Sequence, residues 1–176
     1  EPVQRLRFRI SRTGEARFLS HLELVSAWLR ALRRARAPLS YSQGFHAHPK
    51  LTFATAPPVG EESLGDYMDI VLKERVDPRE LLARLAATLP QGLRAFDAQA
   101  VPLRGPSLMS LLTGFTYAIH ATGDPKAVEA RIAELLASDT ITVERKAKVK
   151  NSGKRIATQN TDIKPMIADL SLDDSK

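Results

Sequence analysis

The sequence predicts an α+β protein built from two ferredoxin-like halves in tandem, each a split β-α-β arrangement with an antiparallel sheet, the second half being shortened. Three observations lead to this fold class. Segments in which apolar residues alternate, as in half-buried strands, are interleaved with segments of helical apolar spacing. In residues 1–102 the order of these segments is β-α-β-β-α-β. After a stretch with prolines and a glycine a similar series begins again, and it reaches Lys176 before a second helix.

The first half opens with a strand and a helix. In RLRFRI (5–10) apolar residues alternate with arginines, which predicts a strand with one buried face. Ser20, followed three residues later by Glu23, is a capping-box pattern, so we expect the helix to begin near Ser20 and to end before Pro38. The apolar stripe that this helix is expected to bury comprises Leu22, Val25, Trp28, Leu29 and Leu32.

Two strands, a second helix and a last strand complete the first half. KLTFA (50–54) is a short strand segment, and DYMDIVLKE (66–74) shows the alternation of a strand. Asp77-Pro78 is a typical helix start, and apolar spacing continues to about residue 89. GLRAFDAQAV (92–101) is the fourth expected strand.

The second half is predicted from a repeat of the same signals and not from repeated sequence. We expect a first domain at 1–102, a linker or crossover at 103–114 and a second domain at 115–176. The expected elements of the second domain are a strand at 115–121, a helix from Asp124-Pro125, a long strand at 140–150, a hairpin turn at 151–153 and a strand at 162–172.

The composition excludes several classes of protein. The chain has no cysteine, so it forms no disulfide, thiolate metal site or iron–sulfur cluster, and it fits a reducing compartment. It contains no run of about 18 uncharged apolar residues, so we expect no membrane span. The first ten residues lack the apolar region of a signal peptide. We therefore expect a cytoplasmic protein.

The positive charge is concentrated in two segments. The formal net charge of +6 arises in residues 1–37, which contain nine arginines and three glutamates. The rest of the chain has equal numbers of basic and acidic residues. Within it, ERKAKVKNSGKR (144–155) has six basic residues and one acidic residue. Concentrated cationic segments favour polyanions, so RNA, either tRNA or rRNA, is the expected partner. An ordinary solvated surface is the alternative.

Residues 14–70 resemble a bacterial family of unknown function, the radical-SAM-linked proteins, which occur alone or fused to the C-terminus of a radical SAM enzyme. The family has a serine–histidine pair near its first helix, and later a run of glycine, phenylalanine, asparagine, proline, histidine, proline and lysine. The matching residues here are Ser20, His21, Gly44, Phe45, His48, Pro49 and Lys50, whereas His46 and Ala47 depart from the run. TDIKPMIADL (161–170) is similar to a further family segment. The resemblance implies a radical SAM enzyme as partner, and a role in RNA modification or ribosome-related metabolism.

Two histidines in that run, His46 and His48, could bear chemistry. A metal site needs about three ligands, and the nearest further candidates are His21, Asp66 and Asp69; we expect no metal. His48 could instead be the general acid or base of a metal-independent enzyme acting on RNA. In that case a cation, Lys50 or Arg17, would stabilise the phosphorane.

We favour a third interpretation, in which His48 supports a binding loop. Tyr41, Phe45 and His46 would stack on bases, while Lys50 and Arg17 would contact phosphate. The chain is then an RNA-binding or RNA-modification accessory protein with no catalysis and no cofactor of its own. The enzyme using His48, and a protein–protein adaptor that binds a radical SAM enzyme, are the alternatives.

Basic residues elsewhere complete the expected RNA contacts. The arginines of the first strand could equally pair with Asp69 on a neighbouring strand, and alternating lysines could protect an edge strand. The full set of candidates is Arg5, Arg7, Arg9, Arg17, Arg30, Arg33, Arg34, Tyr41, Phe45, His46, His48, Lys50, Lys146, Lys148 and Lys150.

Overall fold

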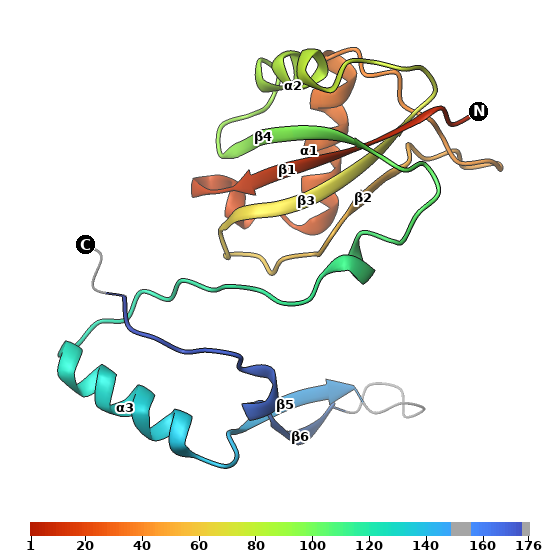
Figure 1. Cartoon of the computed structure of the whole chain (residues 1–176). Helices are drawn as coiled ribbons and strands as arrows, with labels where there is room; N and C mark the ends of the chain where they lie inside the picture. The colour runs from red at the N-terminus through yellow and green to blue at the C-terminus, as the bar shows by residue number, and fades with distance from the viewer. Residues whose placement is uncertain (149–155, 174–176) are drawn as a thin grey trace. The chain divides into compact units, whose positions relative to one another are not determined.

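The computed structural model describes residues 1–148 and 156–173, and the side chains of 146–148 and 156–157 are not among what it describes (Figure 1). The chain divides into two compact units, Glu1–Phe115 and Thr116–Lys176. The described residues form a mixed α+β structure with a four-stranded antiparallel sheet, a two-stranded sheet and three α-helices. None of these helices combines the length and the apolar character needed to cross a bilayer.

The first unit contains the four-stranded sheet and two helices. Its elements are β1 (Gln4–Arg12), α1 (His21–Arg34), β2 (Leu51–Phe53), β3 (Ser63–Leu72), α2 (Pro78–Ala86) and β4 (Leu93–Val101). The predicted order β-α-β-β-α-β is therefore confirmed. The strands are arranged β2-β3-β1-β4, and each neighbouring pair is antiparallel.

One face of this sheet packs against both helices. The alternation of β1 places Leu6, Phe8 and Ile10 in a core that they share with residues of β3 and of both helices. Trp28 of α1 is fully buried in it. The arginines between these residues consequently point to the opposite side, which we call the outer face of the sheet.

The helix starts follow the local sequence. The Ser20 hydroxyl accepts from the Glu23 N–H, and the Glu23 carboxylate accepts from the Ser20 N–H at 2.8 Å, so the predicted capping box is present. The Asp77 carboxylate accepts from two backbone N–H groups at the start of α2, and Pro78 occupies the first turn.

The prediction that Leu22 belongs to the buried stripe of α1 is wrong. Leu22 is 76% exposed, whereas Leu24 is buried. Leu24, Trp28 and Leu32 follow at intervals of four residues and so share one face, and Leu22 is about half a turn away from Leu24. The buried face of α1 is therefore centred on Leu24 and Trp28.

The second unit contains α3 (Pro125–Ala137), β5 (Thr142–Lys148) and β6 (Ile156–Asp162). The helix and the first long strand agree with the prediction, and β5 pairs with β6. The expected hairpin turn at 151–153 lies outside the described residues. The Lys164 ammonium donates to the Leu135 and Leu136 carbonyls, which it caps at the end of α3.

The predictions of strands at 115–121 and at 162–172 are wrong. Residues 115–121 form no strand despite their alternation, because alternation alone does not provide a pairing partner. The strand expected at 162–172 is replaced by β6, which ends at Asp162, and by a 3-10 turn at Lys164–Met166. The Asp162 carboxylate accepts from the Lys164 N–H at 3.0 Å, and Pro165 has no N–H, so extended pairing stops there. Tandem ferredoxin-like halves are thus not established.

Candidate functional site

The residues between α1 and β2 fold back on themselves as a hairpin, here called the 40–50 loop. Its two sides are joined by hydrogen bonds from the Lys50 N–H to the Ser40 carbonyl and from the Ser42 N–H to the His48 carbonyl, both 2.8 Å. Its base is joined to β3, because the Ser40 N–H donates to the Val71 carbonyl and the Val71 N–H donates to the Lys50 carbonyl. Backbone hydrogen bonds therefore fix where the loop leaves the sheet.

The tip of the 40–50 loop presents side chains to solvent. Gly44 has a φ of +118°, a conformation that suits glycine, and it turns the chain. Phe45 next to it is fully exposed, and Tyr41 is 41% exposed. His46 and His48 are exposed as well. The His48 N–H donates to the Ser42 hydroxyl at 2.9 Å, which holds the backbone of the loop and leaves the imidazole at the surface.

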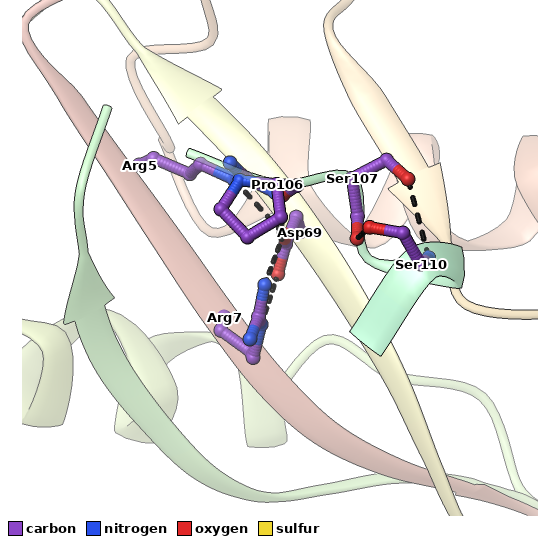
Figure 2. A network of polar contacts seen from close by, with 6 residues as sticks. All are labelled: Arg5, Arg7, Asp69, Pro106, Ser107 and Ser110. Carbon is purple, nitrogen blue, oxygen red and sulfur yellow. Dashed lines mark hydrogen bonds and ion pairs between the residues drawn. The ribbon is translucent and has the colours of Figure 1, made fainter. Parts of the chain in front are cut away.

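The outer face of the sheet carries a carboxylate held by two arginines (Figure 2). Asp69 accepts from Nε and Nη2 of both Arg5 and Arg7, over distances of 2.5–3.0 Å. The exposed fraction of these side chains is 4% for Asp69, 13% for Arg5 and 16% for Arg7. Hydrogen bonding to Asp69 raises the pKa of Arg7. The sequence left open whether these arginines contact RNA or pair with Asp69. In the structure, Arg5 and Arg7 pair with Asp69.

The third arginine of β1 has different surroundings. Arg9 is exposed, faces Tyr67 of β3 in the register, and has its guanidinium 5.9 Å from the Phe96 ring centroid. The Arg94 guanidinium lies 5.2 Å from the same centroid. Arg9 pairs with Asp97 and the next residue pairs with Ala95, so Phe96 is the extra residue of a bulge. This end of the outer face thus combines two cations with an exposed aromatic ring.

A groove of about 400 Å³ lies between the 40–50 loop and the segment 103–108. Its second wall belongs to the stretch that was expected to be a linker or crossover, and in it Leu108 is 3% exposed. The Pro106 carbonyl accepts from Arg5 Nη2 at 3.3 Å (Figure 2). A turn in which Ser107 and Ser110 hydrogen-bond each other follows it. The groove is lined by Arg5, Ser42, His48, Pro49, Lys50, Leu51, Thr52, Asp69, Val71, Leu103, Ser107 and Leu108.

Within the first unit, Arg17 and the arginines of α1 do not line this groove. Arg17 pairs with Glu62 at 3.3 Å, and its guanidinium lies over the Phe18 ring. The arginines of α1 are exposed on the side of the sheet that the helices cover; they are Arg30, Arg33 and Arg34. Lys146 and Lys148 lie on β5 of the second unit, and Lys150 lies outside the described residues. The candidates within the first unit therefore lie on more than one surface.

A second polar cluster, around Arg12, was not expected from the sequence. Arg12 is buried and donates to the carbonyls of Leu19, Pro58 and Glu61, while its Nε has no protein partner among the described residues. Burial lowers the pKa of Arg12 and raises that of Asp66 nearby. Arg12 follows Leu6, Phe8 and Ile10 at intervals of two, so alternation already places it on the buried side, and the register shift between Ile10 and Arg12 makes this end of the strand irregular. Its contacts hold the loop before β3 in place.

Among the described residues, the histidines have no cluster of possible metal ligands around them. His21 packs edge-on against Phe53, with 5.8 Å between ring centroids. Within residues 1–148 and 156–173, no group of three or more histidine, aspartate and glutamate side chains is placed to hold a metal ion.

Comparison with known proteins gives a family but no activity. The family model described as "Uncharacterized protein conserved in bacteria (DUF2344)" matches residues 5–176. This match agrees with the resemblance to a bacterial family of unknown function, and it carries no information on a radical SAM link. No curated protein matches the sequence.

Proposed function

The chain belongs to the bacterial family DUF2344, and from that premise we propose that it is an RNA-binding accessory protein that works with a radical SAM enzyme. The RNA-binding part of the proposal rests on the geometry of the first unit. The radical SAM part rests on the resemblance of residues 14–70, and tRNA or rRNA is the proposed substrate of the partner. Because the chain has no cysteine, the cluster and its chemistry would belong to that partner.

The observation that carries the RNA-binding proposal is the 40–50 loop. It exposes the rings of Tyr41, Phe45 and His46 beside a groove that contains Lys50. Aromatic rings that stack on unpaired bases, next to cations that contact phosphate, are the usual means of binding single-stranded RNA. Phe45 is fully exposed on a hairpin whose base is fixed by hydrogen bonds, so its ring is accessible to a base without rearrangement of the core.

The outer face of the sheet supports the same function. In a common class of RNA-binding domain, bases stack on aromatic residues of a four-stranded sheet. Tyr67 of the central strand β3 is partly exposed, and Arg9 lies beside it in the register. We propose that the first unit is a ferredoxin-like domain of this kind and that the second unit is a shortened one. The fold is an analogy, and the exposed rings and cations carry the proposal.

Phe45→Ala tests the proposal directly. We expect its affinity for a single-stranded RNA of about ten nucleotides to fall by a factor of about ten, because one base loses its stacking partner. Fluorescence anisotropy with labelled RNA measures the affinity. Leu22→Ala is the control, because Leu22 is also strongly exposed but lies at the start of α1.

RNA affinity that is unchanged in both Phe45→Ala and Tyr41→Ala would exclude the 40–50 loop as the binding site. Incubation of the same RNA with the wild-type protein, followed by a check for cleavage, tests the alternative that the protein is an enzyme acting on RNA. Metal-independent cleavage that His48→Ala abolishes would replace the accessory role by catalysis.

A further inference from the structure

We propose that the groove between the 40–50 loop and the segment 103–108 binds the terminal nucleotide of an RNA through a phosphomonoester. This inference rests on the proposed RNA-binding function and assigns the part of the RNA that the groove holds. The phosphate would lie at Lys50 and Arg5, and the nucleoside would lie against the apolar wall made by Leu103 and Leu108.

The charge of the groove matches a phosphomonoester. Asp69 neutralises only one of the two arginines that it binds, so the cluster of Arg5, Arg7 and Asp69 carries one net positive charge. Lys50 adds a second, and within the described chain no hydrogen bond or ion pair engages its ammonium. A phosphomonoester carries about 1.5 to 2 negative charges at neutral pH, whereas a phosphodiester within the chain carries one. The two charges therefore favour a phosphorylated end.

The Arg5 guanidinium and the backbone of the 40–50 loop are already held in place. Arg5 uses Nε and Nη2 for Asp69 and the Pro106 carbonyl, and no contact of its Nη1 is found in the described chain. The buried carboxylate fixes the guanidinium, so binding at Nη1 costs little side-chain entropy. In the 40–50 loop, hydrogen bonds between Ser42 and the backbone of His48 fix the positions from which their side chains extend. Their free donor groups can add to those of Lys50 around one phosphate.

The size and walls of the groove suit one nucleotide. Its volume of about 400 Å³ is near the lower end of small-ligand pockets, about 300–1,000 Å³. Leu103, Leu108 and Val71 supply apolar surface, and Thr52 and Ser107 supply hydroxyl groups for a ribose or base edge. Further nucleotides would extend towards the exposed rings of the 40–50 loop.

The test compares the ends of one RNA. A five-nucleotide RNA of a single sequence is prepared with a 5′-phosphate, with a 3′-phosphate, or with hydroxyl groups at both ends, and the affinity of the full chain for each is measured. We expect one phosphorylated form to bind about tenfold more tightly than the hydroxyl form, as a charge-assisted hydrogen bond predicts. Lys50→Gln should reduce this ratio to about two or less, and Lys50→Arg should retain most of it. Lys73→Gln is the matched control, since Lys73 is exposed at the end of β3 and does not line the groove.

The outcomes separate this inference from the proposed function. Equal binding of all three RNAs would overturn the terminal-phosphate site and leave RNA binding intact. Adenosine 5′- and 3′-monophosphate are tested against adenosine by calorimetry in parallel. Binding of a monophosphate, abolished in Lys50→Gln, without binding of any RNA would support the groove and overturn the RNA function. If Lys50→Gln does not fold, the wild-type protein and Lys50→Arg test the inference instead. Both should bind a phosphorylated RNA more tightly than the RNA with hydroxyl ends, and the absence of this preference would overturn the terminal-phosphate site.

Discussion

At the scale of single residues, Asp69 is a buried charge whose partners are defined. It removes a carboxylate from water and compensates this cost with four hydrogen bonds from two guanidinium groups. Such a cluster adds little net stability compared with apolar residues, but loss of one partner leaves charge without compensation. Asp69 therefore acts mainly by keeping Arg5 and Arg7 in defined positions on the outer face.

Asp69→Asn should lower the free energy of unfolding by about 3–5 kcal/mol, because two partly buried guanidinium groups lose their counter-charge. Urea unfolding measures this change. Asp97→Asn makes the same chemical change at an exposed position of β4 and should alter stability by about 0.5 kcal/mol or less. Equal stability of Asp69→Asn and the wild-type protein would show that the cluster is not formed in solution.

At the scale of elements, the start of α1 depends on a pair of reciprocal hydrogen bonds. Hydrogen bonds from the Ser20 hydroxyl and backbone N–H lower the pKa of Glu23 below its ordinary value. A lowered pKa in the folded state means that the ionised carboxylate favours folding. This contribution is complete above the pKa of the unfolded chain and disappears as the pH falls through the folded value.

Glu23→Gln should therefore lower the melting temperature at pH 7, and the difference from the wild-type protein should shrink as the pH falls below about 4. Thermal unfolding between about pH 3 and pH 7 measures both effects. Glu80→Gln is the control, because Glu80 lies in the first turn of α2 without a reciprocal bond to its cap. A difference that stays constant over this pH range would contradict the role of the ionised carboxylate.

Elements with strong local signals were predictable from the sequence. The alternation of β1 and the caps of α1 and α2 are contained in a few neighbouring residues. The strands expected at 115–121 and 162–172 were wrong because a strand also needs a partner, which local alternation does not specify. The residues from Tyr41 to Lys50 were named as candidates from the sequence, and their role in binding stays a prediction. The second wall of the groove was not named, since nothing local in 103–108 indicates contact with Arg5.

At the scale of the molecule, the cationic residues of the first unit divide between two sides of its sheet. Arg9 and Lys50 lie with the outer face and the groove, whereas the arginines of α1 lie on the helical side. A short single strand in the groove cannot reach both sides. A larger folded RNA can extend around the edge of the sheet and contact the two together.

The combined change of Arg30, Arg33 and Arg34 to glutamine should therefore act in a length-dependent manner. With a five-nucleotide RNA, the dependence of log affinity on log salt concentration should be unchanged. With a full-length tRNA the slope should decrease in magnitude by about two, since each phosphate that a cation neutralises adds about 0.7–0.9 to it. Affinity titrations at several salt concentrations measure the slopes. An equal effect on both RNAs would place the helical arginines in the short-strand site.

The 40–50 loop also bears on how binding preferences can diverge. Its base is joined to β3 through main-chain atoms of Ser40, Lys50 and Val71, and these bonds do not depend on which side chains lie between. The tip contributes no residue to the core. Selection for a new ligand can therefore act on the tip separately from selection for folding, and an engineer can exchange residues 43–47 as a cassette while the scaffold stays constant.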